Sequence, residues 1–277
     1  MVYDCFPFFN ELDLLELRLS ELDSVVDKFV LVEASRNFQK EEKPLYYKEN
    51  IDRFKKYNHK IIHIVVDKFP GFFHKFRIPK PWDYSNFQKN QVSQALKGCK
   101  PSDVIIISDL DEIPKAKKII EYKSKKGIKV FDQLLCYYYM NCVCVESPNE
   151  MNLVKYSEKV YWRGTVMLNY ADFTNFKKVR SHRDFPEGKI IVKDGGWHFS
   201  YLGGAEKILL KVKSLEHASE KHYQIEDMTK ENISTLLNEG KDLYGRPYKY
   251  KFIDETSILP TSVLNNIERW SSFIKKI

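Results

Sequence analysis

Apolar residues in the first part of the chain form short continuous runs, separated by amphipathic or polar segments. The runs lie at residues 2–9, 29–34, 60–67 and 103–107. Runs of this kind are typical of strands buried on both faces of a sheet. Leucines from Leu12 to Leu22 recur at helical spacing, and residues 86–98 predict a second helix that a glycine ends. This alternation predicts an α/β, Rossmann-like fold, with a mostly parallel sheet and helices on both faces.

The pattern changes after Lys115. Residues 129–141 and 159–169 read as longer strands without regular helices between them, and residues 188–204 as a strand with a glycine-rich turn around His198. Residues 205–217 and 261–274 predict helices. Neither an internal repeat nor a low-complexity linker divides the chain. We therefore expect a single domain over residues 1–277 with two functional halves, residues 1–115 and 116–277.

Composition narrows the classes of partner. The net charge of +7 favours an anionic ligand such as a nucleotide phosphate. No zinc-finger spacing or aromatic RNA-binding signature appears, so nucleic acid is not an expected partner. The five cysteines form no CxxC pair, which argues against a disulfide framework or a zinc site and favours a reducing compartment. No apolar run approaches the roughly 20 residues of a membrane span.

Three carboxylates follow the strand predicted at residues 103–107, namely Asp109, Asp111 and Glu112. Ligands of open α/β sheets bind beyond the carboxyl ends of the strands. Strand alternation places Asp109 and Asp111 on one side, and their oxygens suit Mn²⁺ or Mg²⁺. The plainer alternative is a pair of surface aspartates at a turn, since the DxD pattern is common.

Other polar residues occupy comparable positions. His198 lies in a glycine-rich stretch and is either a further ligand of the same ion or a buried histidine. Glu33 and Arg36 lie at the end of the strand predicted at residues 29–34. The glutamate suits a base or ribose hydroxyl and the arginine a phosphate, whereas the alternative is a surface ion pair.

Four stretches together resemble one known family. They are the block from Tyr3 to Phe38, KPLYY at residues 43–47, DVIIISDLDEIP at residues 103–114 and GWHFSYLGG at residues 196–204. Together they resemble glycosyltransferase family 17, with similarity extending from Tyr3 to about His217. The N-terminal block is specific, whereas the DxD is not.

The resemblance implies a GT-A fold, a UDP-sugar donor with N-acetylglucosamine as the expected sugar, a divalent cation, a glycan acceptor and inversion at the anomeric carbon. It assigns residues 1–115 to the nucleotide-sugar and residues 116–277 to the acceptor side and C-terminal helices. Asp109 and Asp111 match the family's DxD, with Asp109 also expected at the ribose. His198 matches its Gly-Trp-His, and Glu33 matches the glutamate that ends the second strand. Lys211 is expected to neutralise phosphate.

The chain departs from the family in the helix before the DxD. The family usually reads Gln-Arg-Asn there, whereas this chain reads Gln88-Lys89-Asn90. A phosphate or base contact near Asn90 is expected, but a lysine cannot reproduce the planar fork of arginine. The anchor and stem of the animal members do not appear in this sequence. The compact chain is rich in Lys, Asn and Ile, as is typical of a microbial or viral member, and we expect it to act in a cytoplasm.

The base that takes the acceptor proton is not identified by spacing. Asp194 is the first choice because it neighbours the turn of His198, and Asp172, Asp184 and Glu112 are alternatives. Two other functional classes stay open. A haloacid-dehalogenase-type phosphatase also places DxD after an apolar strand, and a non-catalytic glycan-binding protein needs no metal.

Overall fold

The computed structural model describes residues 1–69, 79–214 and 228–277. Its centre is one mixed sheet in which eight strands follow the order β11-β7-β6-β9-β4-β1-β2-β3. Three further strands join at the side, because β8 pairs with β9 and β10 pairs with both β5 and β6. The predicted α/β class is confirmed.

The first half supplies the parallel part of the sheet. Its strands are β1 (Val2–Phe8), β2 (Lys28–Ala34), β3 (Ile61–Val66) and β4 (Val104–Ile107). All pairings among them are parallel. The second half contributes β5 (Glu112–Pro114), β6 (Lys129–Tyr137), β7 (Cys142–Glu146), β8 (Leu153–Tyr156), β9 (Lys159–Asn169), β10 (Ile190–Ser200) and β11 (Lys249–Phe252). There only β6 and β10 pair in parallel, so the sheet is parallel on the N-terminal side and mainly antiparallel beyond it.

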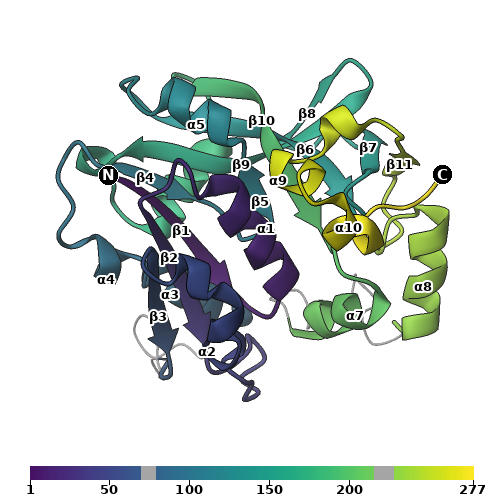
Figure 1. Ribbon diagram of the computed structural model, residues 1–277, viewed down its shortest axis with the longest axis horizontal. Helices are drawn as coiled ribbons and strands as arrows, with labels where there is room; N and C mark the ends of the chain where they lie inside the picture. Colours follow the sequence, from purple (N-terminus) through teal and green to yellow (C-terminus); the bar gives the residue numbers. More distant parts are fainter. Residues whose placement is uncertain (70–78, 215–227) are drawn as a thin grey trace.

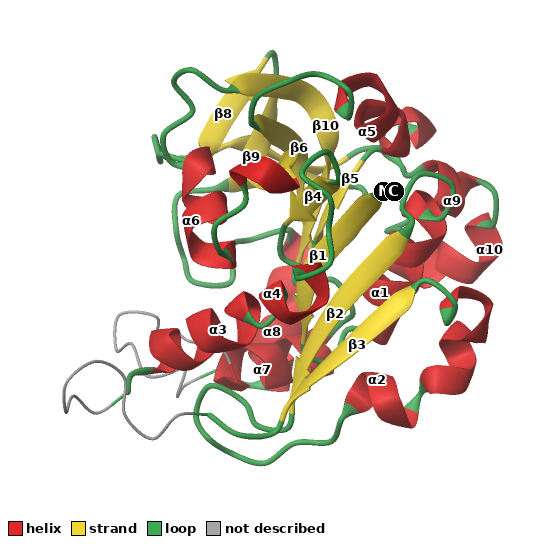
Figure 2. Ribbon diagram, turned by 90° about the vertical axis from the view of Figure 1, so that its left-hand side faces the viewer, coloured by secondary structure: helices red, strands yellow, loops and turns green. Residues whose placement is uncertain are grey.

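Helices cover both faces of the sheet (Figures 1 and 2). On one face lie α1 (Leu12–Leu22), α9 (Thr261–Leu264) and α10 (Ile267–Trp270), and on the other α3 (Pro81–Asn90), α4 (Ser93–Leu96) and α6 (Phe176–Arg180). Strand alternation feeds both cores, since Phe6 and Phe8 pack with α1 whereas Cys5 packs with α4 and α6. Further helices are α2 (Tyr46–Glu49), α5 (Ala116–Tyr122), α7 (Ala205–Ser214), α8 (Lys230–Glu239) and the 3₁₀ helices η1 (Ile51–Tyr57) and η3 (Ser181–Arg183).

Two predicted helices differ from the structure. The helix expected over residues 86–98 begins earlier, at Pro81, and is interrupted between α3 and α4. Lys80 takes the N-cap position and its backbone nitrogen donates to the Asp83 carboxylate, with Pro81 following at the first helical position. The C-terminal helix expected over residues 261–274 is divided into α9 and α10. The last residues of the helix predicted at 205–217 lie outside the described part.

In the described part of the chain, none of the helices combines the length and apolar character that a bilayer-spanning segment needs.

Candidate active site

A single buried arginine shapes the acidic loop between β4 and β5. Arg18 of α1 donates from Nε and Nη2 to both carboxylate oxygens of Asp4, at 2.8 and 2.6 Å. Its Nη1 donates to the backbone carbonyls of Asp109, Leu110 and Glu112, at 3.0, 3.1 and 2.9 Å. One guanidinium therefore holds three carbonyls of the loop and ties them to β1.

Asp109 lies among cations. Its Oδ2 accepts from Arg180 Nη2 at 2.6 Å, and its Oδ1 lies 3.3 Å from Lys89 Nζ. Burial raises the pKa of this carboxyl, but the charges of Arg180, Lys89 and Arg183 outweigh burial and hold the pKa well below its usual range. Asp109 is therefore ionised over the physiological range.

Glu112 anchors the same cluster from inside the protein. Its carboxylate accepts from both Nη atoms of Arg180, one of them at 2.8 Å, and from Trp162 Nε1 at 2.7 Å. The backbone nitrogen of Asp109 donates to it at 2.9 Å. Burial raises the pKa of Glu112, but the charge of Arg180 outweighs burial, so the pKa lies below its usual range. A buried carboxylate with this many donors positions its neighbours and is poorly placed to accept a proton from a substrate.

Asp111 forms the second half of the site. Its Oδ2 accepts from Lys211 Nζ of α7 at 3.2 Å, and Lys211 also pairs with Glu11 at 2.9 Å. Burial lowers the pKa of Lys211, but the two carboxylates more than offset burial and raise it. Lys211, predicted as a phosphate-binding residue, is thus a buried, permanently charged side chain beside the DxD.

His198 faces Asp111 from β10. The distance from its Nε2 to Asp111 Oδ1 is 3.8 Å, and its ring lies 5.3 Å from that of Trp162. Burial lowers the pKa of His198, although Asp111 and Glu112 oppose this effect, so the imidazole is neutral at physiological pH. Its Nδ1 is buried and has no hydrogen-bond partner in the described part of the protein. A neutral imidazole beside a carboxylate suits metal ligation.

Only two of the three predicted metal ligands lie close together in the described part of the chain. Within residues 1–69, 79–214 and 228–277, no three His, Cys, Asp or Glu side chains are grouped as a metal site. Asp109 is turned to Arg180 and Lys89, whereas Asp111 and His198 remain close together. Asp111 and His198, whose Oδ1 and Nε2 lie 3.8 Å apart, would hold a divalent cation, because a carboxylate and a neutral imidazole are both suitable ligands.

These residues border a cavity of about 730 Å³. One end is formed by residues that follow β1 and β2 or lie on α3, and the other by residues of β6, β9, β10 and the chain around β11. The acidic loop lies between the two ends. The first end includes Phe9, Glu11, Arg36, Lys43, Trp82 and Lys89, and the second includes Tyr137, Trp162, His198, Tyr201, Tyr248 and Tyr250.

Of two other residues predicted to bind the donor, one lines the cavity and one does not. Arg36 lines the cavity and pairs with Glu42 at 2.9 Å. Glu33 is fully buried, accepts from the Tyr47 backbone nitrogen and contacts His63 Nε2, both at 3.0 Å, and is not among the residues that line the cavity. Its contacts hold α2 against the sheet.

Asn90 lies at the end of α3, and its Oδ1 accepts from the backbone nitrogen of Lys177 at 3.4 Å. It is not among the residues that line the cavity, whereas its neighbour Lys89 is. The structure thus turns the lysine, and not the asparagine, toward the acidic loop.

Asp194 lies away from the cavity. Its side chain is 53% exposed and pairs with Lys115 at 2.6 Å. The pairing of β10 with β6 shifts between Val192 and Gly196, and Asp194 has a φ of 49° within that irregularity. Of its alternatives, Asp184 lines the cavity, whereas Asp172 does not.

Sequence reasoning missed the cations that neutralise the acidic loop. Arg180 and Arg183 follow in VRSHRD, about 70 positions after the DxD, and both reach Glu112. Glu11, which lines the cavity and pairs with Lys211, was missed as well. The available signal was the cost of crowding carboxylates, which demands nearby positive charge from elsewhere in the chain.

Curated proteins similar to this chain share one name. The human β-1,4-mannosyl-glycoprotein 4-β-N-acetylglucosaminyltransferase is 25% identical over 285 residues, covering 94% of this chain and 52% of that protein. The rat protein of the same name is 24% identical over the same span. This chain spans about half the length of these relatives.

Solved structures show only weak similarity. HddC from Yersinia pseudotuberculosis matches with a TM-score of 0.38 and 14% identity, covering 70% of this chain and 90% of that one. The M. tuberculosis glucosyl-3-phosphoglycerate synthase matches with a TM-score of 0.34 and 9% identity, covering 72% and 71%. Neither score supports a conclusion.

The family assignment rests on sequence. Residues 1–263 match glycosyltransferase family 17. Since this match covers nearly all of the 277 residues, and the relatives above agree with it, the chain belongs to glycosyltransferase family 17.

Proposed function

We propose that this chain transfers N-acetylglucosamine from a UDP-sugar to a hydroxyl of a glycan, with inversion at the anomeric carbon and with a divalent cation. The observation that carries the proposal is the DxD at the end of β4, held between the two ends of one cavity in a member of a glycosyltransferase family. The printed name of the curated relatives supports the sugar. A phosphatase is not favoured, because Asp109, the nucleophile it requires, is paired with Arg180 and Lys89.

The two halves of the chain bind different substrates. Residues 1–115 bind the nucleotide, with the base near the ends of β1 and β2 and Arg36 available to a phosphate. Residues 116–277 provide the acceptor side through the aromatic residues of β6, β9 and the chain around β11. The five free cysteines suit a reducing compartment such as a cytoplasm.

The cations around the loop stabilise the leaving group. As the bond from the anomeric carbon to UDP breaks, its electron pair moves onto the diphosphate. Lys89, Arg183 and Lys211 all line the cavity and supply positive charge near that position. Asp111 and His198 would hold a divalent cation, which supplies further charge stabilisation when it is bound.

A carboxylate must take the proton of the attacking hydroxyl. Asp184 lines the cavity, is 30% exposed and lies 3.5 Å from Arg183 Nε. We assign it this role in place of Asp194. The acceptor oxygen forms its bond to the anomeric carbon on the face opposite UDP, and its proton passes to Asp184.

A thermal-shift panel tests the donor. UDP-, GDP- and CMP-sugars are added with and without Mn²⁺ to the wild type and to Asp111→Asn. We expect UDP-N-acetylglucosamine with Mn²⁺ to raise the unfolding temperature of the wild type, because a ligand of the folded state stabilises it. Asp111→Asn should lose the shift, whereas Asp172→Asn, outside the cavity, should keep it.

A uniformly flat panel, or a shift that Asp111→Asn retains in full, would contradict the proposed donor site. Release of UDP separates the catalytic proposal from a glycan-binding protein, which would bind saccharide without turnover. Release of phosphate from simple esters would instead favour the phosphatase.

Turnover tests the base. We expect Asp184→Asn to lower kcat by about 10²–10⁴-fold while the donor's thermal shift persists, because only proton transfer is lost. Asp194→Asn, the matched control, should keep nearly full activity. The opposite ranking of the two variants would return the role to Asp194.

A further inference from the structure

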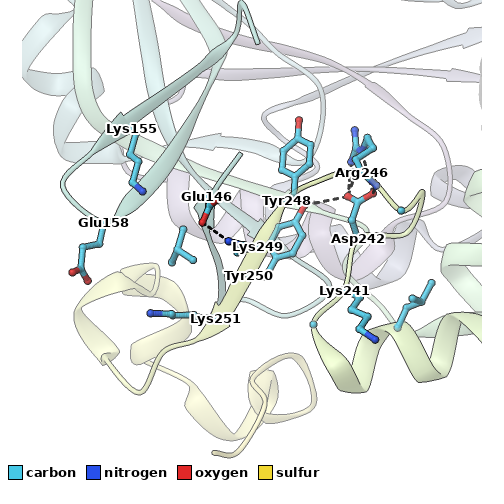
Figure 3. Close-up of a pocket in the computed structure, with 14 residues that line it drawn as sticks. Glu146, Lys155, Glu158, Lys241, Asp242, Arg246, Tyr248, Lys249, Tyr250 and Lys251 are labelled. Atoms are coloured by element: carbon cyan, nitrogen blue, oxygen red, sulfur yellow. Dashed lines mark hydrogen bonds and ion pairs between the residues drawn. The ribbon is translucent and has the colours of Figure 1, made fainter. Parts of the chain in front are cut away.

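A second cavity, of about 740 Å³, opens beside the candidate active site. It lies between β8, β11 and the segment that follows α8 (Figure 3). Three residues, Arg246, Tyr248 and Tyr250, line both cavities. A molecule longer than one sugar in the active-site cavity therefore has a path into the second one.

Flat aromatic rings line that path. Tyr250 stacks on Tyr137 with 4.7 Å between centroids and 12° between planes, and Tyr248 stacks on Tyr250 at 6.1 Å and 7°. Tyr137 borders the active-site cavity, so the three parallel rings run from one cavity to the other. Arrays of aromatic residues with a few placed polar groups are typical of ligand sites.

The shared wall is held in place by a buried ion pair. Asp242 is buried and accepts from Arg246 Nε at 3.1 Å and from Nη2 at 2.8 Å. The Arg246 guanidinium lies 4.6 Å from the centre of the Tyr248 ring. Arg246 is therefore committed to positioning the wall, and other cations must supply any charge for a ligand.

The second cavity carries excess positive charge. Its lining holds five cations and three carboxylates, a difference of two. Lys249 pairs with Glu146 at 2.8 Å, and Lys241 with Glu239 at 2.8 Å. The cations are Lys155, Lys241, Arg246, Lys249 and Lys251, and the carboxylates are Glu146, Glu158 and Asp242.

Two of the lysines that line the cavity form no ion pair in the described part of the chain. In the parts of the chain that the structure describes, neither Lys155 nor Lys251 forms an ion pair, and neither does Glu158. Figure 3 shows Lys155, Glu158 and Lys251 toward one side of the cavity and Arg246 toward the other. The two ammonium groups are available to a bound anion.

We propose that this cavity binds a negatively charged group of the acceptor saccharide, a carboxylate or a phosphate on a sugar beyond the one that reacts. The inference rests on the proposed function and specifies its acceptor. The connecting sugar rings pass along Tyr248 and the edge of Tyr250, which line both cavities, and Lys155 and Lys251 receive the anion. The enzyme then distinguishes acceptors by their charge, through contacts outside the donor site.

Direct binding tests the inference. The probes are mannotriose, the same trisaccharide with a terminal phosphate, the same with a terminal glucuronic acid, and inorganic phosphate alone. We expect the wild type to bind at least one charged trisaccharide about tenfold more tightly than mannotriose, the gain typical of one charge-assisted contact. Which charged probe binds identifies the anion.

Variants locate the site. The double variant Lys155→Ala/Lys251→Ala should lose the tenfold preference and keep the affinity for mannotriose. The matched control Lys123→Ala/Lys126→Ala removes two exposed lysines near α5 and the same net charge, and it should keep the preference. The thermal shift with UDP-N-acetylglucosamine should be unchanged in both.

The inference is overturned if neutral and charged trisaccharides bind equally, if the control loses the preference as the test variant does, or if inorganic phosphate binds as tightly as the phosphorylated trisaccharide. Failure of the proposed function has a different signature, namely the absence of a donor shift in the wild type.

Discussion

At the residue scale, Arg18 determines the shape of the acidic loop. Arg18→Met should destabilise the fold by about 3–5 kcal/mol, because it leaves the Asp4 carboxylate buried without its partner. Arg18→Met/Asp4→Leu removes that charge as well and should recover most of the stability. The loop carbonyls remain unheld in both variants, so the donor's thermal shift should stay weak in both.

Urea unfolding and the donor's thermal shift measure the two effects separately. Donor binding that recovers with stability in the double variant would show that the loop keeps its shape without Arg18. Arg53→Met, which removes a partly exposed arginine from the fold, serves as the control for a general loss of stability.

Spacing could predict only the part of the site that is local in sequence. Asp109 and Asp111 follow a buried strand, and the structure does bring His198 of β10 near Asp111. The contact of Arg180 with the acidic loop was not predictable. It depends on where α6 packs after the antiparallel strands β6 to β9. Asp194 was chosen because it lies near His198 in the sequence, but it falls in the irregularity of β10 and its exposed side chain pairs with Lys115.

At the element scale, helix α1 is tied to distant segments by two carboxylates. Asp13 and Glu16 both accept from Arg53 of η1 and from Arg269 of α10, and Asp13 also accepts from Lys207 of α7. Burial raises the pKa of each carboxyl, but these hydrogen bonds lower each pKa more. Protonation therefore costs the folded state more than the unfolded state.

A lowered pKa in the folded state contributes stability above the unfolded pKa, and this contribution is lost as the pH falls through the folded pKa. We expect the free energy of unfolding to decline below about pH 4. Asp13→Asn/Glu16→Gln should flatten this decline by about 1 kcal/mol, allowing for solvent exposure. Urea unfolding over a pH series measures this decline in the wild type and in the variant.

The control Asp52→Asn/Glu231→Gln neutralises two exposed carboxylates and should leave the slope unchanged. An identical acid slope in the wild type and in Asp13→Asn/Glu16→Gln would show that other groups carry the pH dependence.

The strands were more predictable than the helices. Continuous apolar runs marked β1 to β4. Both faces of β1, β2 and β4 are largely buried, whereas β3 lies at the edge of the sheet and exposes Val65. The predicted helix at residues 86–98 began too late, because its first turn depends on Pro81 and on the bond between the Lys80 nitrogen and Asp83, which a search for apolar periodicity does not detect.

At the scale of the whole molecule, one sheet joins the two halves of the chain. β4 of the first half pairs with β9 of the second, and β1 and β10 contribute to the same core as α1 and α9. The sequence could not predict this pairing order, because β6 bonds to β7, β9 and β10, which are ordered by long-range contacts. The expectation of a single domain rested instead on the absence of a linker or repeat between residues 1–115 and 116–277.

The shared sheet and core predict a single cooperative unfolding transition, because opening either half exposes apolar surface of the other. Asn141 extends this unit to the C-terminus, since it donates to the Lys275 carbonyl at 2.9 Å and accepts from the Lys275 nitrogen at 2.9 Å. Urea curves followed by far-UV circular dichroism and by tryptophan fluorescence should coincide. Asn141→Ala should shift both curves together by about 1–3 kcal/mol. Separated curves, or a shift confined to one probe, would mean that the halves unfold independently and that donor and acceptor sites are joined only by the chain.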